Sequence, residues 1–299
     1  MSASSVSPRA LFLLFVLTIL WGTNWPLFPL AMREVSVWAF RSISVLGAAA
    51  ILLSVARFRG QPLSVPRSLW PTLFAASYSN LLIWNIATAY SSIMIPSGQS
   101  AMLAYTMPLW TAMISVLILG QRLTGRLLLA LLLGGFAVVL LMVPNFAAYA
   151  NAPAGVALGL LAGLGWAVGT LVMKRRTIDV PVTVFTAWQL IVCGVPILMF
   201  ALILGDRQWY WPSWTSVAVI AYITVVPMAL GNVLWFSIVG LLPANLAGLS
   251  AIMVPVVAML TGALLHGEPL GPRQWTAMIF SVAALSLALF KPAEPKTVG

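Results

Sequence analysis

Few residues in this chain of 299 could perform acid–base or metal chemistry. His266 is the only histidine and Cys193 the only cysteine. The acidic residues all fall in loops or at the ends of apolar stretches, at Glu34, Asp179, Asp206, Glu268 and Glu294. None of the spacings matches a metal site, a nucleophile with its base, or a phosphate-binding loop. The sequence predicts no catalytic residue, no metal and no cofactor, which argues against an enzyme.

Four polar residues lie instead inside long apolar stretches, at Asn24, Arg41, Asn85 and Asn232. Such groups are costly in lipid unless they pair with another group or bind a ligand. The three asparagines are predicted either to join helices by hydrogen bonds or to bind the ammonium or carboxylate of a zwitterion. Arg41 is predicted either to extend outward to the membrane surface or to bind a carboxylate or a backbone carbonyl that lacks another partner. The sequence leaves these alternatives open.

Aromatic residues within the same stretches suggest the kind of ligand. The members predicted to contact a substrate are Tyr78, Tyr105, Trp166, Trp188 and Trp235. A cavity lined by several rings suits flat apolar side chains through edge and face contacts, and also organic cations. Packing is the alternative role for each of these rings.

The composition fixes the kind of fold that must position these residues. The chain is 62% hydrophobic and 7% charged, with a mean hydropathy of +1.04. A water-exposed surface cannot be built from so few charges, which excludes a soluble enzyme or a disordered protein. Apolar stretches of about 20 residues predict an all-α polytopic membrane protein with ten transmembrane helices, at residues 10–32, 35–55, 70–92, 98–119, 124–143, 154–174, 181–204, 213–239, 243–265 and 271–290.

The basic residues predict the orientation of these helices. The formal net charge is +10, but the basic residues are spread singly or in small groups between the apolar stretches. This distribution argues against a nucleic-acid partner and is typical of orientation signals. Alternate loops and both termini carry 11 Lys and Arg on one side, against 3 on the other. Both termini are therefore predicted to lie in the cytoplasm.

The two halves of the chain resemble each other at a fixed offset. Five pairs of residues are separated by 147 positions, namely Asn85 and Asn232, Pro96 and Pro243, Pro108 and Pro255, Gly120 and Gly267, and Leu123 and Leu270. Any single match is weak, because prolines and small residues are common in membrane helices. Together the five matches predict an internal repeat, with residues 1–146 as the first five-helix unit and 147–299 as the second.

An odd number of helices in each unit means that the second unit enters the membrane from the opposite side. Many secondary transporters are built from inverted repeats of this kind, with the substrate site near the membrane midplane between the halves. Pro108 and Pro255 are predicted to lie in the middle of helices 4 and 9, where a missing backbone hydrogen bond bends the helix. They are candidate gating positions beside the cavity, with a static kink as the alternative.

These residues resemble a known family. The segment Leu20-Trp21-Gly22-Thr23-Asn24, the Phe40-Arg41 pair and the proline-containing fourth helix are similar to the EamA unit of the drug/metabolite transporter superfamily. The chain as a whole looks most like the bacterial inner-membrane exporters of aromatic amino acids. The resemblance implies a basket of ten helices with a central cavity lined by helices 1, 3, 4, 6, 8 and 9. One departure is Gln121, where the family commonly has the Glu seen at Glu268.

The sequence therefore predicts a secondary transporter in the bacterial inner membrane that exports amino acids, including aromatic ones, and similar small metabolites by alternating access. The alternatives are a broad exporter of small organic compounds, including cations, and a membrane scaffold or sensor that transports nothing. The predicted partners are a small-molecule substrate and the lipid bilayer. The oligomeric state is left open, and a monomer is compatible with the sequence.

Overall fold

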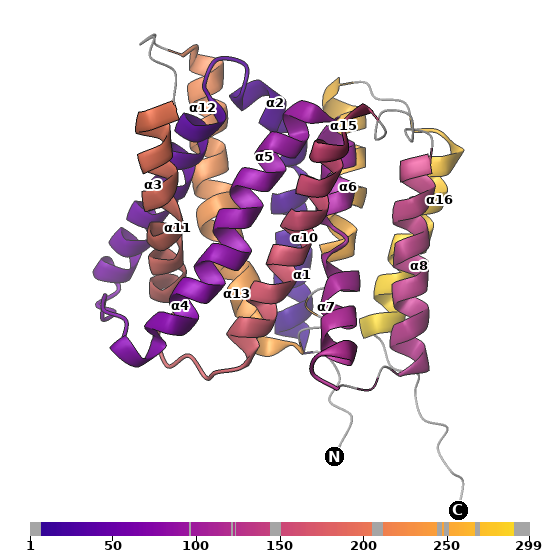
Figure 1. Cartoon of the computed structure of the whole chain (residues 1–299), viewed down its shortest axis with the longest axis horizontal. Coiled ribbons are helices and arrows are strands. Elements are labelled where there is room, and N and C mark those ends of the chain that lie inside the picture. Colours follow the sequence, from indigo (N-terminus) through magenta and orange to yellow (C-terminus); the bar gives the residue numbers. More distant parts are fainter. Residues whose placement is uncertain are drawn as a thin grey trace, which may run out of the picture.

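The structure, a computed structural model, describes residues 7–95, 97–120, 122, 124–143, 151–204, 212–243, 247, 251–266 and 270–289. Throughout these residues the regular structure is helical, and no strand occurs among them. The long helices run side by side across the molecule, with both ends of the chain at one face (Figure 1). The chain is an all-α polytopic membrane protein, as its composition predicts.

The first half contains five segments that match the first five predicted spans. They are α1 (Pro8–Gly22) with η1 (Trp25–Leu27) and α2 (Phe28–Ala31); α3 (Val37–Phe58); α4 (Trp70–Ala76) with η3 (Ser77–Ile83) and α5 (Trp84–Met94); α6 (Ser97–Ala104) with α7 (Met107–Leu117); and α8 (Gly125–Met142). A short η2 (Arg67–Leu69) precedes α4.

The second half repeats this order. Its segments are α10 (Pro153–Lys174); α11 (Val182–Leu204); α12 (Trp214–Ile223) with η5 (Thr224–Gly231) and α13 (Asn232–Leu241); η6 (Ala251–Met253) with α15 (Val254–His266); and α16 (Pro272–Leu289). Six of the described segments are long and apolar enough to cross a membrane, and two more are shorter and apolar. The predicted boundaries agree with these helices to within a few residues, except for the predicted start of the ninth span at 243, which is followed by residues outside those that the structure describes.

Hydroxyl side chains fix where several spans begin. Ser7, Ser36, Thr124 and Ser213 each stand immediately before a helix, and each accepts a hydrogen bond from a backbone N–H in the first turn. Such caps satisfy donors that the helix itself leaves unpaired. The short polar loops between spans therefore end at defined residues.

Glycines let α10 pack tightly against the first half. A Cβ at Gly159 would lie 2.7 Å from Leu103, and a Cβ at Gly163 would lie 2.7 Å from the carbonyl oxygen of Ala104. A Cβ at Gly169 would overlap the side chain of Asn80. Through these glycines α10 lies directly against α5, α6 and η3. The two halves therefore meet along α10.

The remaining helices form pairs around this contact. In the figure α3 and α11 lie together at one side of the molecule, and α8 and α16 lie together at the other (Figure 1). Between the two pairs, α1, α5, α10 and α13 contribute to one large core of buried apolar side chains. Most of the functional residues predicted from the sequence lie in this central part.

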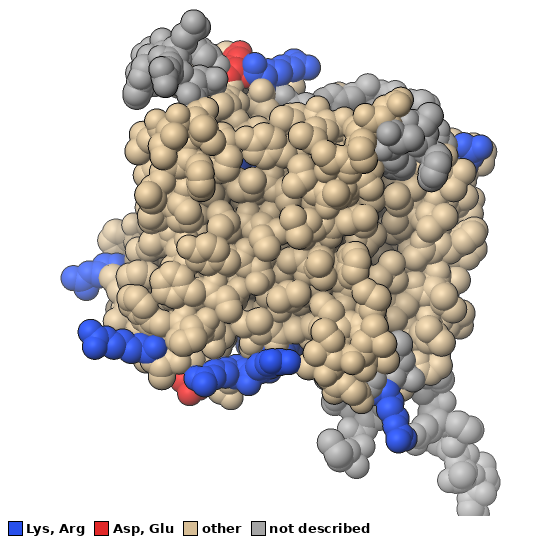
Figure 2. Space-filling view, viewed as in Figure 1, with Lys and Arg blue, Asp and Glu red and all other residues tan. Residues whose placement is uncertain are grey.

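Apart from the buried Arg41, the charged side chains of the described residues lie near the two ends of the helices. Figure 2 shows a broad uncharged band across the molecule, with most Lys and Arg side chains near the face that carries the termini. An apolar band of this kind matches the hydrocarbon layer of a bilayer. The excess of basic residues on one face predicts that this face is cytoplasmic.

We expect reporters fused to either terminus to indicate the cytoplasm. A fluorescent protein should fluoresce at both ends, and a periplasmic phosphatase should be inactive at both ends, because 11 basic residues on the terminal side oppose 3 on the other. Whole cells carrying each fusion provide the measurement. Phosphatase activity at one terminus alone would mean an odd number of spans and would contradict the inverted repeat.

Candidate functional site

Interrupted helices surround the centre of the molecule. The first span stops at Gly22 and resumes at Trp25. The fourth span breaks between Ala104 and Met107. In membrane proteins, irregular backbone at this depth is tolerated where it is buried in protein or lines a cavity. These breaks are therefore typical of a binding site.

Spans 3 and 8 carry a rarer irregularity at equivalent places. Both contain a π-helix, η3 at Ser77–Ile83 and η5 at Thr224–Gly231, and the two starting residues are separated by the repeat offset of 147. The wider turn of a π-helix interrupts the regular i to i−4 bonding, and such turns are frequent at functional sites. The repeat seen in the sequence thus extends to backbone geometry.

Each π-helix is followed by an asparagine that bonds back to it. Nδ2 of Asn85 donates to the carbonyl oxygen of Leu81 at 2.8 Å, and Nδ2 of Asn232 donates to that of Met228 at 2.7 Å. With the nitrogen used in this way, Oδ1 of each asparagine is buried and has no hydrogen-bond partner. Oδ1 of Asn24, in the break of span 1, is also buried and has no hydrogen-bond partner.

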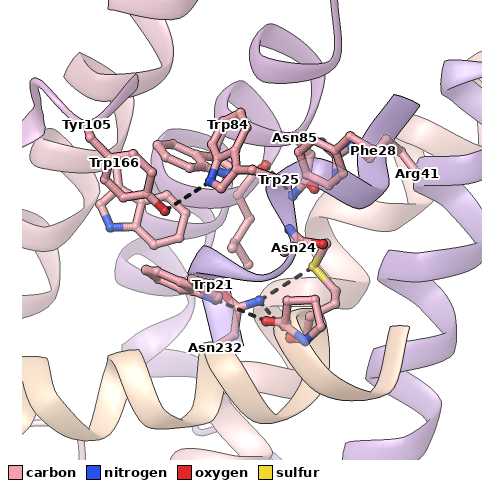
Figure 3. A pocket seen from close by; sticks show the side chains of 13 residues that line it. Trp21, Asn24, Trp25, Phe28, Arg41, Trp84, Asn85, Tyr105, Trp166 and Asn232 are labelled. Carbon is pink, nitrogen blue, oxygen red and sulfur yellow. Dashed lines mark hydrogen bonds between the residues drawn. The ribbon is translucent and has the colours of Figure 1, made fainter. Parts of the chain in front are cut away.

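These three amide oxygens belong to residues that line a single central cavity (Figure 3). Its walls come from α1, η1, α2, α3, η3, α5, α10, η5 and α13 and from the breaks in spans 1 and 4. The residues are Trp21, Asn24, Trp25, Phe28, Arg41, Leu81, Trp84, Asn85, Tyr105, Trp166, Pro227, Met228 and Asn232. The cavity volume is about 40 Å³, far below the roughly 300–1,000 Å³ of typical ligand pockets. The structure therefore shows this site in a contracted form.

Arg41 places a positive charge at one end of the cavity (Figure 3). Its side chain is 1% exposed, and its guanidinium lies 4.6 Å from the ring centre of Phe28. It donates to Oγ1 of Thr88 at 3.2 Å, while its Nε has no partner. No acidic residue in the described part of the chain lines the cavity. A buried guanidinium without a carboxylate is ready to bind an anionic group.

Aromatic rings form the opposite wall of the cavity. The ring centres of Trp84 and Trp166 are 4.6 Å apart. Trp25 donates from Nε1 to the hydroxyl of Tyr105 at 3.4 Å, and their rings lie at 5.9 Å. These four residues give the cavity flat apolar surfaces, with a hydroxyl among them, at a distance from Arg41 (Figure 3).

Three tryptophans from α1, α10 and α13 meet beside the cavity. Trp21, Trp166 and Trp235 contact one another, with ring centres 5.4, 5.5 and 5.6 Å apart. Trp21 also donates from Nε1 to the carbonyl oxygen of Pro227 at 3.2 Å, which ties span 1 to the π-helix of span 8. We call these three residues the tryptophan triad. It joins the two halves of the chain.

Most of the predicted site residues come together in this cavity. Those that line it are Asn24, Arg41, Asn85, Tyr105, Trp166 and Asn232. The outward orientation considered for Arg41 is wrong, because the residue is buried. Hydrogen bonds between helices, considered for the asparagines, are also wrong for Asn85 and Asn232, whose amide nitrogens bond within their own span.

Three aromatic predictions need correction. Tyr78 of η3 is 44% exposed, packs beside Phe74 at the surface and does not line the cavity. Trp188 donates from Nε1 to the carbonyl oxygen of Leu63 in the loop between α3 and η2, and it does not line the cavity. Trp235 lies behind the cavity wall as a member of the tryptophan triad, and it does not line the cavity.

The two prolines are also placed differently from the prediction. Pro108 and Pro255 are each the second residue of a new helix, α7 and α15, and do not lie within a continuous bent helix. Proline is favoured there because the first turn needs no backbone N–H. Pro108 faces a small side cavity between α7 and α8. A gating role for the two prolines stays a prediction.

Some residues that line the cavity were not predicted to do so, chiefly Trp21, Trp25, Phe28 and Trp84. Trp21 belongs to the motif of span 1 and Trp25 directly follows it, so the motif could have indicated both residues. Trp84 immediately precedes Asn85, and this position next to a predicted site residue could have indicated Trp84. The predictions concerning Gln121, Glu268 and the repeat boundary at 146 and 147 concern residues outside those that the structure describes.

Comparisons with known proteins agree with this arrangement. The model of the EamA-like transporter family matches residues 8–143 and 153–290. The chain is 26% identical to an uncharacterized transporter of Bacillus subtilis, YvbV, over 96% of this chain and 94% of that protein. It is 28% identical to an uncharacterized inner membrane transporter of Escherichia coli K12, YedA, over 94% and 92% of the two chains.

The fold also matches a solved crystal structure. The TM-score is 0.78 at 18% identity, covering 94% of this chain and 96% of the other. At that level of identity the match concerns the fold alone.

Proposed function

The chain belongs to the EamA-like transporter family, and from that premise we propose that it exports zwitterionic solutes, amino acids with aromatic side chains among them, by alternating access through the central cavity. It is a multi-pass membrane transporter. The proposal concerns its cargo, its direction of transport and its mechanism.

One observation carries the choice of cargo. The cavity contains a buried guanidinium without an acidic partner and three amide oxygens without donors, at Arg41, Asn24, Asn85 and Asn232. A carboxylate pairs with the first and an ammonium donates to the others. An amino acid supplies both groups on one carbon atom, so it satisfies every unpaired group that these four residues leave in the cavity.

The aromatic wall supports cargo with a flat side chain. Trp25, Trp84, Tyr105 and Trp166 surround the part of the cavity farthest from Arg41 (Figure 3). Rings in contact at offset or perpendicular angles stabilise each other by about 0.5–1.5 kcal/mol beyond the burial of their area. A substrate oriented by Arg41 and the amides would direct its side chain toward these rings.

The contacts that close the cavity support alternating access. Trp235 follows Asn232 by three residues, so the tryptophan triad lies about one helical turn nearer the face that carries the termini. On the opposite face, the backbone N–H of Ser213 donates to Oε2 of Glu34 at 2.8 Å and joins the two halves there. This bond lowers the pKa of Glu34. Opening one of these contacts at a time would expose the site to one side at a time.

Export of organic cations is less well supported, because Arg41 would repel a cation without a carboxylate. A scaffold or sensor would have no use for two closures around a polar cavity. Liposomes that contain the purified protein distinguish all three possibilities. We expect radiolabelled phenylalanine to leave them downhill without ATP or a proton gradient, with a shallow dependence between about pH 6 and 8, since no described carboxylate lines the cavity to titrate.

The same liposomes give the outcomes that would overturn the proposal. Flux of tetraphenylphosphonium but not of phenylalanine would indicate a cation exporter. The absence of flux for both, with folded protein in the membrane, would indicate a scaffold or sensor. Flux of phenylalanine that vanishes without a pH gradient would keep the cargo and contradict the facilitated mechanism.

Replacing Trp166 with Ala should weaken transport of phenylalanine more than transport of threonine. The ring of Trp166 lines the cavity, and its loss removes contacts worth about 1 kcal/mol to an aromatic cargo, or roughly fivefold. The ratio of the two transport rates under subsaturating conditions is the measurement. Trp188→Ala is a matched control, because that ring lies away from the cavity. An equal loss for both cargoes would place the side chain elsewhere.

A further inference from the structure

A second cavity lies at the face that carries the termini. It has a volume of about 460 Å³ and is formed by the end of α10, the loop that follows it, the start of α11 and the end of α13. Its lining residues are Met173, Lys174, Arg175, Arg176, Thr177, Ile178, Val180, Val182, Phe185, Thr186, Phe236, Val239 and Gly240. No residue of the central cavity is among them.

The rim of this second cavity is strongly basic. Lys174, Arg175 and Arg176 follow one another at the end of α10 and are exposed. Arg176 donates to the carbonyl oxygen of Ser68 at 3.2 Å, which fixes the rim against the segment before α4. Lys174 and Arg175 make no ion pair or side-chain hydrogen bond with any described residue. Asp179, in the same loop, is not part of the lining. The rim therefore favours an anion.

The interior of the cavity is apolar apart from one hydroxyl. Phe185, Phe236 and Val239 are buried there. Thr186 is fully buried as well, and its Oγ1 has no hydrogen-bond partner. A buried hydroxyl without a partner is costly. The hydroxyl of Thr186 is therefore free to pair with a polar atom of a ligand in this cavity.

The depths of these groups correspond to those of a phospholipid. Lys174 ends a spanning helix and Val182 begins the next one, so both lie near the level of lipid phosphates. Thr186 is four residues further along α11, which places it about 6 Å deeper at 1.5 Å per residue. The ester carbonyls of a phospholipid lie below its phosphate in the same way.

The cavity also has exposed apolar residues on two helices. Val182 of α11 is 38% exposed, and Gly240 of α13 is exposed with no atom within 4 Å of where its Cβ would be. Both residues line the cavity near the level of the lipid phosphates, so the headgroup and glycerol of a lipid can reach it there, with an acyl chain extending past them toward Phe185 and Phe236.

We propose that this second cavity binds an anionic phospholipid, with the phosphate at Lys174 and Arg175, an ester carbonyl on the hydroxyl of Thr186, and an acyl chain against Phe185 and Phe236. Basic pockets between membrane helices are known to bind acidic headgroups. The uncompensated charge of the rim favours an acidic lipid over a zwitterionic one. The proposal goes beyond the proposed transport function and does not depend on it.

Native mass spectrometry of the purified protein tests this proposal. The probes are palmitoyl-oleoyl phosphatidylglycerol, phosphatidylcholine with the same chains, and inorganic phosphate. We expect the wild type to prefer phosphatidylglycerol, and the Lys174→Gln/Arg175→Gln variant to lose about 30-fold in affinity for it. The Arg57→Gln/Arg59→Gln variant removes the same charge from another loop and should bind as the wild type does.

Two further variants separate the parts of the proposed site. Thr186→Val should weaken both lipids alike by about fivefold, because both carry the ester. Gly240→Leu adds a side chain to the lining of the cavity and should reduce binding of both lipids as well, and the free space around Gly240 allows this variant to fold. Melting temperatures in detergent check folding.

Several outcomes would overturn the proposal. Equal retention of the two lipids by the wild type would show that the basic rim does not distinguish an acidic headgroup from a zwitterionic one. An equal loss of affinity for phosphatidylglycerol in the Arg57→Gln/Arg59→Gln control would mean that the effect comes from the net charge of the protein and not from this cavity. Binding of inorganic phosphate without either lipid would indicate a site for a soluble anion.

Discussion

Replacing Arg41 with Gln should abolish most amino-acid transport, with a loss of about 30-fold or more in the rate at low substrate concentration. Removing one partner of a buried, hydrogen-bonded charge pair costs about 2–5 kcal/mol, and about 1.4 kcal/mol corresponds to a factor of ten. Arg41 is the charged residue that lines the central cavity. No other described residue there can replace it as a partner for a carboxylate.

The measurement is flux of phenylalanine and of phenethylamine, which lacks the carboxylate. Arg41→Gln should lower the first and leave the second unchanged or raise it, because a repulsive charge has been removed. Arg126→Gln is a matched control, since that arginine bonds to the carbonyl oxygen of Leu287 between α8 and α16, away from the cavity. A loss shared by both cargoes in a folded Arg41→Gln protein would contradict the carboxylate contact.

Replacing Asn85 or Asn232 with Leu should each reduce amino-acid transport by about 10- to 100-fold. A hydrogen bond from an ammonium contributes about 1.5–3 kcal/mol, and Oδ1 of each asparagine has no other donor. The similar geometry of the two residues predicts similar losses at both positions. Flux of phenylalanine, with melting temperature as the check on folding, is the measurement.

The chain offers a close control for this experiment. Asn80 is a buried asparagine in the same π-helical segment as Leu81, but it packs against Gly169 of α10 and does not line the cavity. Asn80→Leu should leave transport nearly intact. Phenylpropionate, which lacks the ammonium, should be insensitive to all three variants. If Asn80→Leu were as damaging as Asn85→Leu, the asparagine effects would be structural.

The number and order of the spans could be predicted from the sequence because hydropathy reports burial in lipid directly. The repeat could be predicted as well, since identical residues recur at one offset. The sequence could not predict which individual side chains face the cavity and which face the lipid. Lipid and protein interior are both apolar, so Tyr78 on the surface and Tyr105 at the cavity stand in segments of the same character. Only the fold distinguishes them.

The local backbone geometry of the spans also could not be predicted from the sequence. Pro108 and Pro255 showed that spans 4 and 9 are irregular, but a kinked helix and a broken one carry the same proline. The π-helices left few signals in the sequence, namely the asparagine that follows each of them and Pro227, which lies inside η5 and has no counterpart in η3. The three basic residues at the end of α10 were counted only as an orientation signal. The cavity beside them is formed in part by residues of α13, and the sequence alone could not place α13 there.

The matching π-helices also bear on the history of the gene. A π-helical turn holds about one residue more than an α-helical turn, so the insertion of one codon into an ancestral helix is one way to produce it. Ser77–Ile83 and Thr224–Gly231 carry it at the same point of both halves. One insertion before a duplication explains both copies, and the ancestral five-helix unit then already bore its asparagine. Two such units, inserted in opposite directions, would have formed the site between them before fusion joined them into one chain.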